Sequence, residues 1–528
     1  MLNNTMHFIS CSRLHLASSS TIGATRRIYV LVWLLLLTTT MALSLNKTYD
    51  LVIIGGGAAG LTAAKLAATF DKSAVIIEQA RMGGDCTWTG CVPSKSLVAS
   101  AKVAHFARNA EKYGVTADNV RVDMKAVKKR IFDNIQRIHD EDDSPEAMAK
   151  LGIDTLVGRA ILKSPSLLEV TMEGSSEILL IEAKEGVVVC TGAKPRKPQD
   201  TIPGLKDVDY LTYEEIWELD YLPQRLTVIG GGPIGCELAQ AFARLGSTVT
   251  QIATKLVSNE EPEASETLEE VFEAEGVKRV KGTLVNVQGN GGGHIALCTC
   301  DDGTSVTIEG DSILVAVGRV PNVKGFGLEE LGIRFTSTGG IETDKTLQTS
   351  VKGIYAAGDC TGDKQYTHYA GFQGAIAARN ILLPFSDGGV LQDIPSATFT
   401  SPEISSVGLS HAAAIVEYGN DKVEVAFKKL DHVDRAICDG EEKGFIKIIY
   451  LKKNLQIIGA TVMSPSAGEL ISEISVAMRA KMPFDQLSYV VHSYPAYSIA
   501  LQIMAAQINY SKTKKLQPIL AFLKKLGL

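Results

Sequence analysis

Two stretches of this chain repeat one pattern, in which a short apolar strand leads into a glycine turn and an alanine-rich helix. The first reads YDLVIIGGGAAGLTAAKLAATF from Tyr49, and the second reads RLTVIGGGPIGCELAQAFARLG from Arg225. In a Rossmann βαβ unit, such a turn lets the amides at the helix N-terminus hold a pyrophosphate. Two units therefore predict an α/β fold with two dinucleotide-binding domains. The glycines are Gly55, Gly57 and Gly60 in the first unit and Gly230, Gly232 and Gly235 in the second.

The two units differ at the end of their second strand. Glu78 lies 23 residues after Gly55, where a carboxylate can accept hydrogen bonds from ribose hydroxyls. The same offset from Gly230 reaches Ala253, and Lys255 follows two positions later. A carboxylate at this place would repel a 2′-phosphate, whereas a lysine would pair with it. The second unit is therefore predicted to prefer NADPH to NADH.

The segment GGDCTWTGCVPSK, residues 83–95, holds two cysteines five positions apart. On a regular helix the Cα atoms of Cys86 and Cys91 would lie about 8.7 Å apart, beyond the roughly 4.4 to 6.8 Å that a disulfide spans. A bridge therefore requires a broken turn, which Gly90 permits, while Pro93 fits the first turn of a following helix. Two unrelated buried thiols or half of a metal site are the alternatives, although zinc sites usually use closer pairs and a second pair.

Together with the glycine turns, this segment resembles the redox-active disulfide of the flavin-dependent pyridine nucleotide-disulfide oxidoreductases, the family of dihydrolipoamide dehydrogenase, glutathione reductase and mercuric reductase. The resemblance extends from about Tyr49 to Tyr510. It implies a dithiol that takes electrons from reduced FAD and passes them on. By this resemblance Cys91 is the flavin-facing thiol, Cys86 is the exchange thiol and Lys95 lies near the flavin ring.

The same resemblance implies further cofactor contacts. The TGA turn at 191–193 marks the crossing from the flavin domain, Asp359 in GIYAAGDCTG binds the ribityl chain, and Glu237 pairs with Lys95. The predicted FAD-binding residues are Gly55, Gly57, Ala59, Gly60, Glu78, Gly84, Lys95, Thr191, Gly192 and Asp359. The predicted NAD(P)-binding residues are Gly230, Gly232, Ile234, Gly235, Glu237, Ala253, Lys255 and Gly318.

The C-terminal stretch VVHSYPAYSIA departs from the family's disulfide reductases, which carry His-Pro-Thr and a glutamate five residues after the histidine. Tyr494 precedes Pro495 where histidine is expected, and Ile499 replaces the glutamate. A phenol with a pKa near about 10 is a poorer proton shuttle at neutral pH than an imidazole near about 6.5. His492, two residues earlier, is an alternative acid. The predicted catalytic residues are Cys86, Cys91, Glu237, His492 and Tyr494, and no metal ligand is predicted.

A tyrosine in this neighbourhood is similar to the mercuric reductase branch, as is the DRA at 434–436 followed by GFIKI. Two mercury-handling features of that branch are missing, because the chain has no N-terminal CxxC module and no cysteine after Cys438. The predicted acceptor is a metal ion or a small molecule, such as a quinone or a small disulfide.

The predicted organisation is two Rossmann-like domains followed by a C-terminal α+β dimerisation domain, and the resemblance implies a homodimer whose sites are completed by the partner chain. The formal net charge of −6 offers no basic surface for nucleic acid. The predicted segments are 1–47 (targeting segment or membrane anchor), 48–222 and 319–390 (FAD-binding domain), 223–318 (NAD(P)-binding domain), 391–510 (dimerisation domain) and 511–528 (basic tail).

The first 49 residues contain no Asp or Glu and carry arginines ahead of the apolar run 28–37. This pattern predicts a signal or a membrane anchor that directs the protein to an organelle or the secretory route. If translation starts instead at Met41, a cytosolic enzyme results.

The leading interpretation is an enzyme that passes electrons from NAD(P)H, preferably NADPH, through FAD and the cysteine pair to an external acceptor, in the manner of mercuric reductase. Dihydrolipoamide dehydrogenase or another disulfide reductase is the alternative enzyme. A dimeric FAD-binding scaffold or redox sensor is the non-enzymatic alternative.

Overall fold

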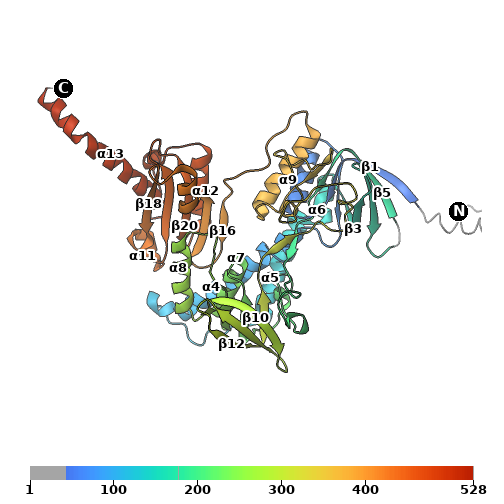
Figure 1. Ribbon diagram of the computed structural model, residues 1–528, viewed down its shortest axis with the longest axis horizontal. Helices are drawn as coiled ribbons and strands as arrows, with labels where there is room; N and C mark the ends of the chain where they lie inside the picture. The colour runs from blue at the N-terminus through green and yellow to red at the C-terminus, as the bar shows by residue number, and fades with distance from the viewer. Residues whose placement is uncertain (1–42, 176–177, 527–528) are drawn as a thin grey trace, which may run out of the picture.

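The computed structural model describes residues 43–175 and 178–526 (Figure 1). Most of the predicted targeting segment, residues 1–42, lies outside the described residues, and Leu43 already begins strand β1 (Leu43–Ile54). Within the described ranges, no helix has both the length and the apolar character needed to cross a membrane.

The first glycine turn joins β1 to helix α2 (Ala58–Thr69), and β2 (Ala74–Glu78) runs parallel to β1. Residues 51–54 are all buried because both faces of this sheet are covered. Strand β5 pairs with β1 on its other side, and β15 extends the sheet beyond β5. The remaining strands are β3 (Asp154–Leu162), β4 (Leu167–Met172), β5 (Ile178–Val189) and β15 (Ile354–Ala356).

Helix α9 (Thr367–Leu382) packs against α2 on one face of this sheet. The two helices approach so closely that a Cβ on Gly374 would lie 2.0 Å from the carbonyl oxygen of Ala59. The other helices of the first domain begin within the cysteine segment or follow it. They are α3 (Gly84–Trp88), α4 (Cys91–Arg108), η1 (Ala110–Tyr113), α5 (Met124–Ile138), η2 (His139–Asp143) and α6 (Pro145–Lys150).

The second glycine turn begins a smaller parallel sheet with strand order β13-β7-β8-β9. Its helix α7 packs against α4 of the first domain, and Phe242 of α7 and Leu97 of α4 share an apolar core with Ile131 of α5. The elements are β7 (Arg225–Ile229), α7 (Pro233–Leu245), β8 (Thr248–Ile252), α8 (Pro262–Ala274), β9 (Lys278–Val280) and β13 (Ser312–Val315).

An antiparallel sheet of β10 (Gly282–Gly289), β11 (His294–Cys300) and β12 (Ser305–Gly310) is inserted before β13. The glycine-rich stretch 290–293 is the loop between β10 and β11, so it is a hairpin connection. Strand β14 (Arg319–Pro321) then pairs with β6 (Ala193–Pro195) where the chain returns to the first domain. Short helical turns flank these strands, namely η3 (Leu205–Asp207), η4 (Ile216–Glu218) and η5 (Asp359–Thr361).

The C-terminal domain is a five-stranded antiparallel sheet with the order β16-β17-β20-β19-β18, set apart from the first domain (Figure 1). Helices α12 and α13 cover its apolar face, where Val462, Ile471 and Leu501 are buried. The α/β fold with a C-terminal α+β domain is therefore confirmed. The elements are β16 (Ser396–Thr398), β17 (Glu403–Gly408), α10 (His411–Tyr418), β18 (Val423–Lys429), η6 (Leu430–His432), α11 (Asp434–Asp439), β19 (Phe445–Leu451), β20 (Ile457–Ser464), α12 (Ala467–Arg479), η7 (Phe484–Tyr489) and α13 (Ile499–Lys525).

A buried ionic cluster fixes the nucleotide domain to the C-terminal domain. Lys447 of β19 lies 2.8 Å from Glu261 and 2.7 Å from Glu263, at the start of α8. The side chains of Lys447 and Glu261 are only 6% and 3% exposed. Glu261 also accepts a hydrogen bond of 2.6 Å from the backbone amide of His411. We call this cluster the interdomain clamp.

Candidate active site

The two cysteines lie on either side of a break between α3 and α4. A Cβ on Gly90 would lie 2.9 Å from the carbonyl oxygen of Asp85, so glycine suits this tight bend. Both cysteines are free thiols in this structure, and the Cys86 thiol hydrogen-bonds to Cys91 Sγ. The break that a bridge requires is therefore present, and it brings the two sulfur atoms together.

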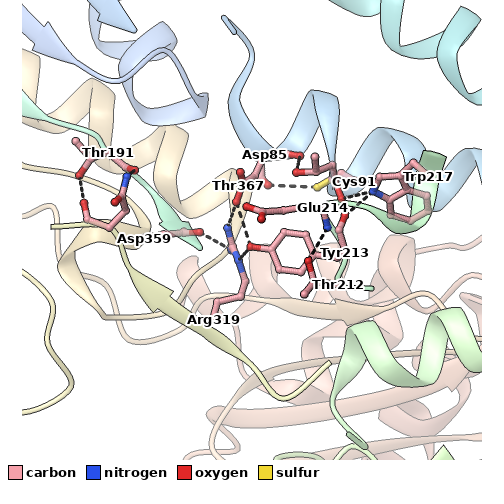
Figure 2. A network of polar contacts seen from close by, with 12 residues as sticks. Asp85, Cys91, Thr191, Thr212, Tyr213, Glu214, Trp217, Arg319, Asp359 and Thr367 are labelled. Atoms are coloured by element: carbon pink, nitrogen blue, oxygen red, sulfur yellow. Dashed lines mark hydrogen bonds and ion pairs between the residues drawn. The ribbon is translucent and has the colours of Figure 1, made fainter. Parts of the chain in front are cut away.

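The surroundings make the two thiols electrostatically different. The hydrogen bond from Cys86, the hydroxyl of Thr367 and the charge of Lys95 lower the pKa of Cys91 to about 6, although burial opposes them. Thr367 Oγ1 lies 3.3 Å from Cys91 Sγ, at the first residue of α9 (Figure 2). The hydrogen bond to Cys91 and burial raise the pKa of Cys86 far above its usual range. Cys91 is therefore the thiolate at neutral pH.

The predicted pair of Lys95 and Glu237 is formed, with 2.7 Å between Nζ and Oε2. Lys95 lies one turn after Cys91 on α4, and Glu237 reaches it from α7 because these two helices pack together. The backbone amide of Phe399 donates to the other carboxylate oxygen of Glu237 at 2.8 Å, and Lys95 Nζ lies 4.3 Å from the centre of the Phe399 ring. The lysine is thus held with its charge near Cys91.

Figure 2 shows a second cluster around Arg319 of β14, which the sequence analysis missed. Its guanidinium forms ion pairs with Asp359 and, at 2.5 Å, with Asp85, and its Nε lies 3.1 Å from the hydroxyl of Tyr213. Burial raises the pKa of Asp359, although the charge of Arg319 opposes that effect. Two signals were available, because Asp85 directly precedes Cys86 and Arg319 directly follows the predicted Gly318.

The first glycine turn has room for a pyrophosphate. A Cβ on Gly55 would lie 2.3 Å from the carbonyl oxygen of Cys190, and one on Gly60 would lie 2.0 Å from that of Gly55, so both glycines allow close packing. At Gly57, the residue before α2, a Cβ would meet only a Gly84 carbon at 3.8 Å. The amides of the first turn of α2 are left for a ligand. These residues fit the pyrophosphate of FAD.

Other predicted flavin contacts lie around this turn. Glu78 at the end of β2 accepts hydrogen bonds from the amides of Gly56 (2.7 Å) and Ala80 (2.9 Å), so its carboxylate is fixed beside the turn. Ala59 is buried against α9. The hydroxyl of Thr191 donates to the Asn322 carbonyl at 2.6 Å, and Gly192 follows with φ of 69°. The structure thus gathers these residues at the carboxyl ends of β1, β2 and β5.

The second glycine turn repeats this arrangement. Cβ atoms on Gly230 and Gly235 would lie 2.2 and 2.3 Å from carbonyl oxygens, whereas one on Gly232 would meet nothing within 4 Å. Ile234 is half-buried in the first turn of α7. Gly318, with φ of 105°, also faces open space. These residues fit a second pyrophosphate, that of NAD(P)H.

The predicted ribose end of the second unit lies beside this turn. Ala253 is buried directly after β8, and Lys255 is exposed. Its backbone passes close to the turn, because a Cβ on Gly231 would lie 2.2 Å from the carbonyl oxygen of Lys255. Arg279 of β9, which sequence reasoning missed, donates to the Thr254 carbonyl at 2.8 Å and is paired with Glu269. Lys255 and Arg279 therefore lie at the end of β8 beside the second glycine turn, where Glu269 already pairs with Arg279.

The two predicted acids, His492 and Tyr494, lie within the C-terminal domain. The hydroxyl of Tyr494, a 68% exposed side chain, donates to Asp434 Oδ2 at 2.8 Å, and this carboxylate raises the pKa of Tyr494. His492 is held on both sides, with Nε2 2.6 Å from Glu473 and Nδ1 2.8 Å from the Val490 carbonyl. Neither side chain contacts the cysteine pair within the described part of the chain, so one protomer does not bring them together.

Comparison with known proteins identifies the family. Residues 49–378 match the pyridine nucleotide-disulphide oxidoreductases, and residues 394–505 match the dimerisation domain of the same group. The chain belongs to this family. It is accordingly an FAD-dependent oxidoreductase with NAD(P)H as its electron donor, so the scaffold alternative is set aside. The dimerisation domain supports a homodimer.

Several relatives within the family are similar over most of their length. A mercuric reductase from Streptomyces lividans is 34% identical, with 90% of this chain and 99% of the relative covered. A dihydrolipoyl dehydrogenase from Chlamydia muridarum is 32% identical over 85% of this chain and 95% of the relative. Among solved structures, LpdA from Mycobacterium tuberculosis has a TM-score of 0.78 at 30% identity, covering 87% of this chain and 99% of its own.

A Cu(II) complex of a variant of the HOCl-induced flavoprotein disulfide reductase RclA from Escherichia coli is also similar. Its TM-score is 0.77 at 25% identity, with 88% of this chain and 99% of the other covered.

Proposed function

We propose that this oxidoreductase passes electrons from NADPH through FAD and the Cys86–Cys91 pair to an external metal ion. The family supports the path from NAD(P)H to FAD, and relatives named mercuric reductase support the metal. FAD would be held by the first glycine turn, Glu78 and Asp359, and NADPH by the second turn and Lys255. Bound FAD supplies the two-electron exchange between the nicotinamide and the cysteine pair.

The residues of this chain prepare the cysteine pair for a soft metal ion. Lys95 and Thr367 favour the thiolate form of Cys91, and thiolates are the ligands that soft ions prefer. Glu237 holds Lys95 in place. Oxidation of the pair to a disulfide releases two electrons and the protons that the thiols hold, which matches reduction of a divalent ion to the metal.

The observation that carries the choice of acceptor is the state of Tyr494. A disulfide acceptor needs a proton for each thiolate that it releases, whereas reduction of a divalent metal ion needs none. The phenol of Tyr494 is bound to Asp434 and its pKa is raised, so it is a poor acid at neutral pH. Tyr494 occupies the position at which the family's disulfide reductases carry the histidine that donates the proton.

One observation favours a second candidate, a dihydrolipoyl dehydrogenase-like disulfide reductase. His492 and Glu473 form an imidazole–carboxylate pair with 2.6 Å between Nε2 and Oε1. Such a pair, displaced by two residues from the usual histidine, could donate a proton to a partner chain's thiolate. Because both ring nitrogens already face acceptor oxygens, the metal acceptor remains the better supported proposal.

The test is steady-state oxidation of NADPH and NADH by the FAD-loaded enzyme with Hg(II) plus thiol, Cu(II), a quinone, lipoamide or glutathione disulfide. We expect turnover with a metal ion and little with either disulfide. Tyr494→Ala should leave metal turnover within about threefold, whereas Tyr494→His with Ile499→Glu should raise disulfide turnover by about 10²-fold or more, the usual contribution of a positioned acid. Tyr489→His, on another exposed tyrosine, is the matched control.

Fast lipoamide turnover by the native enzyme would contradict the metal proposal. In that case His492→Ala should abolish the disulfide activity while sparing electron transfer from NADPH to FAD, which would assign the proton to His492.

NADPH preference has its own test in Lys255→Glu. Reversing this exposed charge should raise KM for NADPH by roughly tenfold and leave KM for NADH nearly unchanged. Lys278→Glu, on an exposed lysine of the same domain, should change neither value. Equal effects on both coenzymes would remove Lys255 from the 2′-phosphate site.

We also propose that the segment before Leu43 directs the enzyme to an organelle or the secretory route. The arginines and the apolar run 28–37 support this proposal. N-terminal sequencing of the protein from its native source should find a start near residue 42. A chain that begins with an intact Met1 would mean that the segment is retained as an anchor, and a chain that begins at Met41 would contradict the targeting proposal.

A further inference from the structure

The last helix, α13, is longer than its domain can cover. Its first part is packed into the C-terminal core, where Ala500, Leu501 and Met504 are buried. Among the side chains that the structure describes, Asn509 and Lys512 make the last polar contacts with the domain, through Ser488 Oγ at 2.6 Å and Asp485 Oδ2 at 2.6 Å. The rest of the helix projects away from the body of the protein (Figure 1). We call residues 514–526 the projecting helix.

The composition of the projecting helix is both basic and apolar. The chain contains no Asp or Glu after residue 485, whereas five lysines lie in the last 18 residues, at positions 512, 514, 515, 524 and 525. Apolar residues occupy positions 516, 519, 520 and 523, the spacing of one side of a helix. Among the side chains that can be described, Phe522 and Leu526 are 61% and 58% exposed.

The charge of this helix decides what can cover it. Without the five lysines the chain would have a formal charge of −11 (48 basic against 59 acidic residues), so the tail is opposite in sign to the rest. Neither of two tails (residues 511–528) has an Asp or Glu to pair with these lysines, so tail-to-tail association would bring like charges together. An anionic lipid surface offers both an apolar layer and negative headgroups.

We propose that the projecting helix binds the surface of membranes that contain anionic lipids. Its apolar residues would enter the headgroup boundary, and its lysines would lie among the phosphates. One such helix binds weakly, but a homodimer carries two, so the second binding event becomes intramolecular. This inference is independent of the electron acceptor.

The test is co-sedimentation of the full-chain holoenzyme with vesicles of phosphatidylcholine alone or mixed with phosphatidylglycerol. The native enzyme should bind the mixed vesicles, and binding should weaken as salt is added. A chain that ends at Thr513, and so keeps the Lys512–Asp485 ion pair, should lose this binding. Lys524→Gln with Lys525→Gln should weaken it by roughly tenfold or more, and Phe522→Ser with Leu526→Ser should weaken it similarly.

Lys452→Gln with Lys453→Gln removes the same charge from exposed positions elsewhere in the C-terminal domain. This control variant should leave vesicle binding unchanged. NADPH oxidation by the shortened chain should equal that of the full chain, which shows that the truncated protein is folded. Equal vesicle binding by the full and shortened chains would overturn the proposal. So would a shift from dimer to monomer on truncation, or capture of the helix by a soluble acidic protein in the absence of vesicle binding.

Discussion

Cys91 owes its low pKa to neighbours from three different helices. Cys86 lies across the broken turn, Lys95 lies one helical turn later, and Thr367 comes from α9 of the first domain. The hydroxyl of Thr367 is the contact that can be removed with least disturbance, because valine has nearly the same shape. Each neighbour favours the thiolate form of Cys91, so the reduced enzyme holds a thiolate at Cys91 and a thiol at Cys86.

Titration of the reduced enzyme tests this arrangement. Because the pKa of Cys91 is lowered to about 6, its thiolate absorbance should be present at neutral pH and disappear as the pH falls through about 6. Thr367→Val should move this midpoint upward by about one pH unit, the equivalent of one hydrogen bond to a charged group. Thr62→Val, which removes a hydroxyl bonded only within α2, is the control. An unchanged midpoint in Thr367→Val would contradict the assignment.

Arg319 is a second residue on which distant segments depend. Arg319→Gln would leave Asp85 and the buried Asp359 without a cation, so it should cost about 3 to 5 kcal/mol of folding free energy. Thermal unfolding and FAD retention measure this loss. Asp85→Asn keeps a hydrogen-bonding side chain, so it should lose much less folding free energy and retain FAD better than Arg319→Gln. Equal losses in the two variants would mean that the ion pairs do not account for the effect.

At the scale of elements, the active site is a product of helix packing. Helix α4 carries Cys91 and Lys95 at its N-terminal end, and α7 carries Glu237 against it, so contact between the first and second domains places Lys95. The interdomain clamp then fixes the second domain to the third through α8 and β19. The three domains are thereby joined to one another.

The clamp can be tested by Lys447→Met. Removing the buried cation leaves Glu261 without its partner and should destabilise the enzyme by about 3 to 5 kcal/mol, seen as a lower midpoint of urea unfolding. Lys443→Met is the matched control, because its ion pair with Glu270 is exposed and should be worth at most about 1 kcal/mol. A loss no larger than that of the control would show that the cluster contributes little.

The packing of α9 on α2 gives another prediction at this scale. Gly374→Ala would place a Cβ 2.0 Å from the carbonyl oxygen of Ala59, so the two helices would have to separate. We expect a loss of about 1 to 3 kcal/mol, together with weaker FAD retention. At Gly371 on the same helix, a Cβ would come no closer than 3.3 Å to the hydroxyl oxygen of Thr62, so Gly371→Ala should be milder. Comparable losses would contradict the close approach.

The sequence predicted those parts of the site that local spacing controls. Both glycine turns and the broken turn at Gly90 followed from local spacing, whereas the pairing of Lys95 with Glu237, 142 positions apart, followed only from the family resemblance. The pairing of Arg319 with Asp85 was not predicted, because the two residues are 234 positions apart and no periodic pattern links them. The contact of Lys447 with Glu261 was missed for the same reason, since either residue alone resembles a surface charge.

At the scale of the whole molecule, the predicted acids His492 and Tyr494 and the cysteines of one chain lie in different domains. Tyr494 and His492 contact only C-terminal residues in the described structure, whereas Cys86 lies on α3 and Cys91 at the first residue of α4 in the first domain. The family's homodimer is expected to bring His492 and Tyr494 of each subunit to the partner's cysteines. The projecting helix extends from the same C-terminal domain, so this domain carries both the residues around Tyr494 and the projecting helix.

This separation has a genetic consequence. For disulfide reduction, two alleles that each fail alone, one lacking the cysteines and one with Tyr494 in place of the acid, could restore each other when their products assemble together. A subunit with Cys86→Ser that carries the engineered His-Glu tail should lend its imidazole to a partner with native cysteines. Co-purified mixed dimers should then reduce lipoamide, although neither homodimer does so. Complementation between alleles, ordinarily a sign of two separate genes, would here arise within one.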